Sequence, residues 1–125
     1  MTTLRIGVAS YDEMKARTLE IARGRRKPRP DEPKVWFTSI ESMAKILSDR
    51  NRALLALIAE TNPRSLAELA DRSGRAKSNL SRTLRTMERY GLVELRKGPG
   101  RVLVPHVPYR AIRLDLAVTD PRVAA

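Results

Sequence analysis

The sequence contains no cysteine and a single histidine, and these two scarcities exclude several classes of protein. Without thiols, a disulfide framework, a thiolate zinc site and a cysteine nucleophile are all impossible. The lone histidine, His106, has no catalytic motif around it, and the scattered carboxylates show no spacing typical of metal ligands. We therefore expect no enzyme activity, no metal site and no cofactor.

Long apolar runs are also absent, and acidic residues are outnumbered. The longest apolar run, Ala53 to Ala59, is far shorter than the ~20 residues of a membrane span, and the N-terminus does not resemble a signal peptide. We expect a cytoplasmic protein without a membrane partner. The 125 residues carry 25 Lys and Arg against 14 Asp and Glu, a formal charge of +11. Such an excess favours a polyanionic partner, with an anionic membrane surface as the electrostatic competitor.

Proline, glycine and charge divide the chain into four predicted segments. Residues 1–24 are an N-terminal extension, with a strand near Leu4 to Val8 and a helix that Ser10 caps. Residues 25–34 are a basic, proline-rich linker, residues 35–118 are the main domain, and residues 119–125 are a tail. The basic side chains of the linker are either a solvated connection or a candidate DNA-binding arm; they are Arg25, Arg26 and Lys27.

The first half of the main domain is predicted to be helical. A short strand at 35–37 precedes a helix opened by a capping box from Thr38 to Glu41, and further helices begin after Ser48 and Ser65. A turn at Ser73 and Gly74 leads to a last helix that ends near Gly91. The inward positions of this last helix are Leu80, Leu84 and Met87.

The second half is predicted to contain strands. Strand-like runs at 92–96 and 102–104 flank a Gly/Pro loop, which indicates a β-hairpin with a basic tip. The alternation over 111–118 places Ile112, Leu114, Leu116 and Val118 on one side and predicts a half-buried strand. The fold class that follows is α+β, mainly α.

The order helix, helix, turn, helix, hairpin is that of a winged helix-turn-helix, in which the helix after the turn enters the major groove. Between Ala76 and Tyr90 the only carboxylate is Glu88. An asparagine such as Asn79 can bond an adenine edge, and an arginine such as Arg82 a guanine edge. The candidate DNA contacts on the helix are Lys77, Ser78, Asn79, Ser81, Arg82 and Arg85, and those on the hairpin, or wing, are Arg96, Lys97 and Arg101.

Five stretches carry a resemblance to a known family: Phe37–Ser42, Asn51–Ile58, Ser65–Ala70, Ser78–Leu84 and Tyr90–Glu94. Through them the chain resembles the MarR-type winged helix-turn-helix transcriptional regulators, and in particular a subgroup of short antitoxin-like regulators. The resemblance implies a homodimer, sequence-specific binding near its own promoter, a recognition helix at 77–90 and a wing at 95–103. One departure is Ala76, where such relatives often place an aspartate or a hydroxyl residue.

Two functions stay open at this point. The first is an autorepressor that binds double-stranded DNA as a homodimer. The second is an antitoxin-type interaction module that neutralises a partner toxin, with DNA binding secondary. Two apolar segments exceed a minimal winged helix and are candidates for the toxin or dimer contact; they are Leu4 to Arg23 and Ala111 to Val118. RNA binding is less favoured, because the few aromatic residues are not interleaved with the basic clusters.

Overall fold

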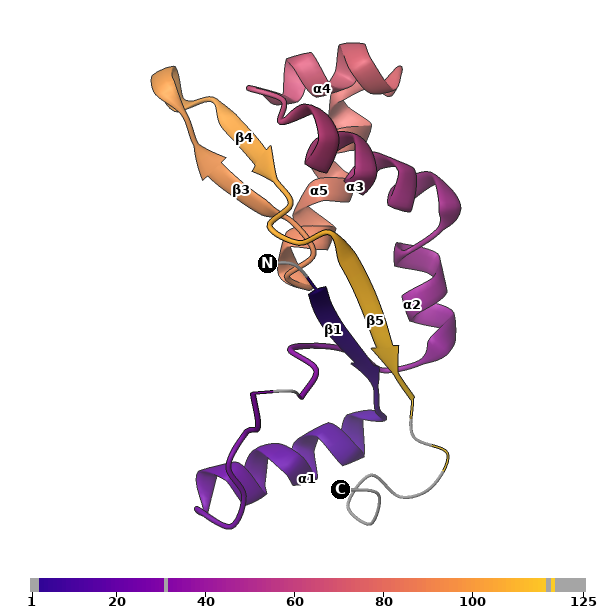
Figure 1. The fold of residues 1–125 in the computed structure, drawn as a ribbon, viewed down its shortest axis with the longest axis vertical. Coiled ribbons are helices and arrows are strands. Elements are labelled where there is room, and N and C mark those ends of the chain that lie inside the picture. The colour runs from indigo at the N-terminus through magenta and orange to yellow at the C-terminus, as the bar shows by residue number, and fades with distance from the viewer. Residues whose placement is uncertain (1–2, 31, 117, 119–125) are drawn as a thin grey trace.

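The structure, a computed structural model, describes residues 3–30, 32–116 and 118 (Figure 1). Within these ranges the fold is α+β, as predicted, and none of its helices is long and apolar enough to cross a membrane. The elements are β1 (Thr3–Val8), α1 (Tyr11–Ala22), β2 (Val35–Phe37), α2 (Ile40–Ile46), α3 (Asp49–Thr61), α4 (Leu66–Ser73), α5 (Lys77–Arg89), β3 (Glu94–Lys97), a 3-10 turn (Pro99–Arg101), β4 (Leu103–His106) and β5 (Ala111–Asp115).

Serine side chains fix the starts of four helices. In α1, α3 and α4 the predicted serine accepts a hydrogen bond from the backbone N–H three residues on; these caps are Ser10, Ser48 and Ser65. The predicted box from Thr38 to Glu41 is wrong by one residue. Ser39 is the cap of α2: its hydroxyl accepts from the Ser42 N–H at 3.0 Å, and the Ser42 hydroxyl donates to the Ser39 carbonyl at 2.9 Å. This reciprocal serine pair replaces the expected one.

A parallel sheet joins the two ends of the chain. β1 lies between β2 and β5, with Ile6 opposite Val35 on one side and Leu114 on the other. The Ile6 side chain is 1% exposed and belongs to the same apolar core as the helices. The boundary predicted after residue 24 therefore does not separate this strand from the main domain. Among the helices only α1 lies outside this core, since none of its residues is buried in the core or packed against it.

The proline-rich segment at 25–34 has no helix or strand among its described residues, yet side chains hold it in place. The Glu32 carboxylate accepts hydrogen bonds from Arg17 on α1 and from Arg26, the latter at 3.1 Å. Burial opposes ionisation of Glu32, but the hydrogen bonds from both arginines outweigh it and lower its pKa. The Arg17 guanidinium also lies 5.5 Å from the ring centroid of Trp36 on β2. A segment expected to be a free linker is thus tied to α1 and the sheet.

Contacts at and just after the C-terminal end of α5 join this helix to the rest of the core. The predicted inward residues of α5 are confirmed as buried; they are Leu80, Leu84 and Met87. The Tyr90 ring stacks on Phe37 of β2 with centroids 4.7 Å apart. The buried Tyr109 hydroxyl donates to the Leu92 carbonyl at 2.8 Å, and burial raises the pKa of Tyr109 to about 12. These contacts fix α5 against the sheet.

The last strand is shorter and more exposed than predicted. β5 ends at Asp115, and of the predicted apolar side only Ile112 packs against the core. Leu114 and Leu116 are 41% and 49% exposed, so the half-buried strand expected over 111–118 is wrong in this respect. The predicted alternation is present, but within the described residues no other part of the chain covers Leu114 or Leu116. The predicted tail at 119–125 lies outside those residues.

Candidate nucleic-acid interface

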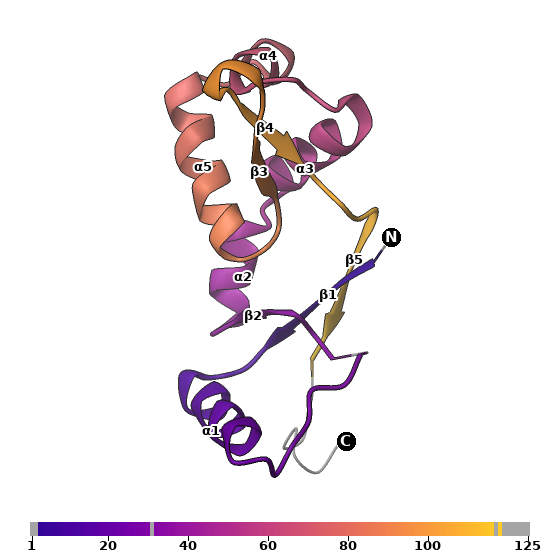
Figure 2. The same ribbon diagram turned by 90° about the vertical axis from the view of Figure 1, so that its left-hand side faces the viewer.

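The turn between α4 and α5 sets the direction of α5. Gly74 ends α4 with a φ of +73°, a left-handed conformation that suits glycine. Only Arg75 and Ala76 separate it from α5, which packs against α4. Because one side of α5 is buried, its other side is turned to the surface (Figure 2). Four predicted contact residues are exposed there, Lys77, Ser78, Arg82 and Arg85, while Asn79 and Ser81 are half-buried.

The exposed side of α5 is positive along most of its length. Glu88 is its only carboxylate and lies near the C-terminal end. At the other end Ala76 offers no side-chain cap, so the first backbone N–H groups of α5 have no hydrogen-bond partner from a capping side chain. These amides and the helix dipole add to the positive charge of Lys77 and Arg82. The surface is therefore suited to a polyanion.

Arg75, which sequence reasoning did not select, organises the start of this surface. Its guanidinium donates to Asn79 Oδ1 from Nε at 3.0 Å and from Nη2 at 2.8 Å. It also donates to Thr83 Oγ1 at 3.2 Å and to Asn51 Oδ1 at 3.4 Å. All of these acceptors are neutral, so the positive charge is not cancelled by them. Burial, and then the nearby Arg50, lower the pKa of Arg75, but a guanidinium remains protonated at neutral pH.

The Arg75 contacts restrict what Asn79 can bind. A side-chain amide oxygen has two lone pairs, and both of those on Asn79 face Arg75 donors. The opposite amide orientation would point N–H groups at N–H groups, so the network itself fixes the assignment. In this conformation Asn79 offers only its Nδ2 donor to a ligand. The predicted two-bond contact with adenine needs both groups and would require Arg75 to release Asn79.

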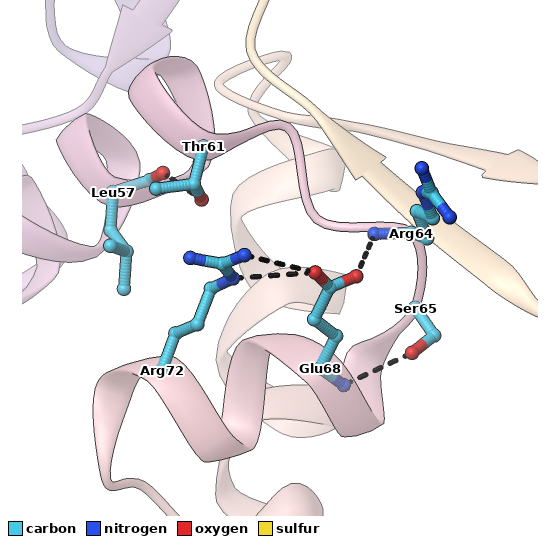
Figure 3. A network of polar contacts seen from close by, with 6 residues as sticks. All are labelled: Leu57, Thr61, Arg64, Ser65, Glu68 and Arg72. Carbon is cyan, nitrogen blue, oxygen red and sulfur yellow. Dashed lines mark hydrogen bonds and ion pairs between the residues drawn. The ribbon is translucent and has the colours of Figure 1, made fainter.

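A second polar network anchors the start of α4 (Figure 3). The Glu68 carboxylate accepts from the Arg64 backbone N–H at 2.7 Å and from Arg72 Nε and Nη2 at 3.3 and 3.2 Å. The backbone bond from Arg64 is the main reason why the pKa of Glu68 is lowered. Ser65 completes the cap by accepting from the Glu68 N–H at 3.0 Å. Since α4 packs against α5, this network helps to hold α5 in place.

The β3–β4 hairpin lies beside α5 and carries the other predicted basic residues. Its strands pair at 94–97 and 103–106, later than the predicted runs, because Leu92 and Val93 are buried in the core instead. Arg96 donates to Glu94 at 3.0 Å, which partly offsets its charge. Lys97 and Arg101 are exposed at the tip, and within the described part of the chain no carboxylate forms an ion pair with either of them.

The elements that carry the predicted contact residues lie in two separate regions of the molecule. In both views the hairpin tip and α4 lie at one end of the long axis, while α1 lies at the other (Figures 1 and 2). α5 and the hairpin are in contact, so their basic residues share one region. The candidate arm follows α1 and is not brought to that region. Arg25 and Lys27 are exposed, whereas Arg26 is paired with Glu32.

A shallow groove of about 450 Å³ extends the basic surface from α5 towards α2. Arg82 and Thr86 line it from α5, and Lys45 and Ser42 line it from α2. Lys45 is exposed and is a second residue that sequence reasoning missed, because nothing in the sequence indicates that α2 lies along α5. Over the residues that the structure covers, no cluster of three His, Cys, Asp or Glu side chains is arranged to hold a metal ion.

Comparison with known protein families gives a match. The sequence model of a protein family described as HVO_A0114 matches residues 46–114, which is more than half of the chain. The matched segment begins at the last residue of α2 and includes α3, α4, α5, the hairpin and most of β5. A search of curated proteins found no match.

Proposed function

The protein belongs to the HVO_A0114 family, and we propose that it is a sequence-specific regulator of transcription that binds double-stranded DNA as a homodimer and represses its own promoter. In this proposal the chain is a MarR-type winged helix. Helices α4 and α5 are its helix-turn-helix, α5 enters the major groove, and the β3–β4 hairpin is the wing.

The observation that carries the proposal is the outward side of α5. Its exposed residues are cations and hydroxyls, the one carboxylate is at the far end, and a hairpin with two exposed cations lies beside it. A solvated helix without a ligand ordinarily mixes both signs of charge on its outer side. A helix of this composition next to a basic hairpin is more typical of a DNA-binding surface than of an ordinary solvent-exposed surface.

The residues divide into base readers and backbone contacts. Arg82 is exposed near the middle of α5 and has the two-pronged donor that matches guanine O6 and N7. Ser78 and Lys77 are in the first turn of α5, beside backbone amides that no side chain caps, and in this proposal they contact phosphate. Lys97 and Arg101 at the small hairpin tip suit the backbone or the minor groove.

Fluorescence anisotropy tests the proposal directly. The purified protein is titrated against the duplex upstream of its own gene and against a scrambled duplex, across a salt series. Preference for the first by about a thousandfold, with a slope of several released counterions, is the expected result. Equal and salt-sensitive affinity for both duplexes would reject sequence-specific recognition.

A pair of variants separates base reading from general charge. Arg82→Ala should cost about 1 to 3 kcal/mol on the specific duplex and little on the scrambled one. Arg23→Ala is the matched control, because it removes the same charge from an exposed position at the α1 end. Equal losses on both duplexes would make Arg82 a phosphate contact.

A second candidate function, neutralisation of a partner toxin, is favoured by α1. No residue of α1 is buried, and Tyr11 and Leu19 are 71% and 42% exposed on it. These two exposed apolar side chains are candidate contacts for another protein. If a toxin is encoded beside this gene, co-expression should restore growth, and Leu19→Glu should abolish the rescue while leaving duplex affinity unchanged.

A further inference from the structure

The outer edge of β5 is an unpaired sheet edge. In the sheet order β2-β1-β5, one side of β5 pairs with β1, and no described strand pairs with the other. Proline is one of the residues that keep an exposed sheet edge from pairing, and the five residues of β5 contain none. We propose that a second copy of this chain pairs with this edge, antiparallel, about a two-fold axis that passes through Leu114. The inference rests on the proposed homodimer and specifies its interface.

The apolar side of β5 indicates that something covers it. Leu114 is 41% exposed, although it pairs with the buried Ile6 and shares its side of the sheet. Leu116, just beyond the end of β5, is 49% exposed. Strands of parallel sheets are normally covered on both sides. In the proposed pair Leu114 meets its own copy, and Ile112 meets Leu116 of the other chain, so each exposed leucine gains an apolar neighbour on its own side of the sheet.

Charge selects this register over its neighbours. A two-fold axis at Leu114 places Arg113 opposite Asp115 of the second copy, and the reverse pair forms by symmetry. An axis at Arg113 or at Asp115 would place that residue opposite itself, and an axis at Ile112 would place Arg113 opposite Ala111. Opposite charges in directly facing positions stabilise an antiparallel pair, and like charges destabilise it. Among these registers only the one at Leu114 joins an arginine to an aspartate.

The contacts within one chain favour the same register. Arg113 lies directly opposite Arg5 of β1, which is a like-charge pair. Asp115 is 3.9 Å from Arg5, too far for a strong hydrogen bond. In the dimer the second copy places Asp115 on the free side of Arg113, which offsets the repulsion from Arg5.

The symmetry also suits DNA binding. A two-fold axis perpendicular to the sheet makes the same face of the sheet point in the same direction in both copies. The helices that pack on Ile6, Val35 and Phe37 then lie on one side of a continuous sheet. Two α5 helices related in this way read a pseudo-palindromic site.

A single cysteine tests the register, because the natural chain has none. Leu114→Cys places two thiols directly opposite each other, where Cα atoms of an antiparallel pair are about 4.5 or 5.5 Å apart, within disulfide range. Arg113→Cys is the matched control, since residue 113 and its copy are diagonal neighbours about 7 to 8 Å apart. Under mild oxidation we expect a cross-linked dimer from the first variant and monomer from the second on a non-reducing gel.

The outcomes of the cysteine test are distinct. Cross-linking at 113 in place of 114 overturns the register. Failure of both variants to cross-link, together with a monomer in sedimentation equilibrium at micromolar concentration, overturns the interface. Neither measurement uses DNA, so each result is independent of whether the duplex titration succeeds.

Charge reversal provides a test without a covalent bond. Arg113→Asp and Asp115→Arg should each raise the dimer dissociation constant about tenfold or more. Each substitution puts like charges opposite one another, and by symmetry this happens at two places in the dimer. The double variant should return to within about threefold of the natural chain. Arg113→Asp faces Arg5 within its own chain, so it should fold normally. A double variant as weak as the single ones would overturn the proposed pairing.

Discussion

The hydrogen bonds between Arg75 and Asn79 predict how much Asn79 contributes to base reading. A two-bond contact between an asparagine and adenine is worth about 1 to 3 kcal/mol. Arg75 occupies both acceptor positions of Asn79 Oδ1, at 3.0 and 2.8 Å, which leaves one of the two bonds. Asn79→Ala should therefore cost about half as much, ~0.5 to 1.5 kcal/mol, or about 2- to 12-fold in affinity.

A double-mutant cycle measures this restriction. Arg75→Met removes the guanidinium, frees Asn79 Oδ1 and keeps a long side chain. In that background Asn79→Ala should cost the full ~1 to 3 kcal/mol on a site with adenine at the contacted position. Competition anisotropy with duplexes that differ only at that base provides the free energies. Urea unfolding of Arg75→Met accounts separately for any loss of stability.

Two results would refute the reasoning. One is a loss from Asn79→Ala in the natural chain as large as that from Arg82→Ala, with adenine preference lost as well. That outcome would mean that Arg75 releases Asn79 on binding. The other is an equal cost of Asn79→Ala in both backgrounds, which would mean that the two side chains act independently.

Three further predictions concern single residues. Arg101→Ala should weaken binding to all duplexes alike and reduce the salt slope by about one; an unchanged slope would remove the hairpin tip from the interface. Tyr109→Phe leaves the buried Leu92 carbonyl without its donor, so urea unfolding should show a loss of about 1 to 3 kcal/mol. Because burial raises the Tyr109 pKa to about 12, stability that is full below pH 10 should fall between pH 10 and 12, and Tyr109→Phe should lack that fall. The lowered pKa of Glu68 stabilises the folded state above pH 4.5, and this contribution should disappear as the pH falls through the folded-state pKa. Acid unfolding of Glu68→Gln should therefore show a shallower transition than that of the natural chain. An identical transition would contradict the role of the hydrogen bond from the Arg64 N–H.

Local signals in the sequence were sufficient for most helices. Ser10, Ser48 and Ser65 cap the helices that they were expected to cap, because a cap depends on residues only three positions apart. The same holds for Gly74, whose left-handed conformation ends α4. The buried side of α5 also followed from its spacing, since Leu80 and Leu84 are one helical turn apart.

Features that depend on distant residues were not predicted. β1 was placed in a separate extension because its partner strand β5 is encoded at the other end of the chain. The 25–34 segment was interpreted as free because the bonds of Glu32 to Arg17 and Arg26 do not follow from composition. Arg75 went unnoticed because its role depends on Asn51, Asn79 and Thr83 converging from two helices.

The pairing of β1 with β5 has a consequence for synthesis on the ribosome. Leu4 is synthesised well before its partner Ile112, because all the helices and the hairpin lie between them in the sequence. While α3, α4, α5 and the hairpin emerge, β1 can pair with β2 but keeps its other edge open. Such an edge can capture strands of neighbouring nascent chains, and contacts of long sequence separation form slowly. The interval before residues 111–115 leave the ribosome is therefore the period in which this protein is most exposed to misassembly.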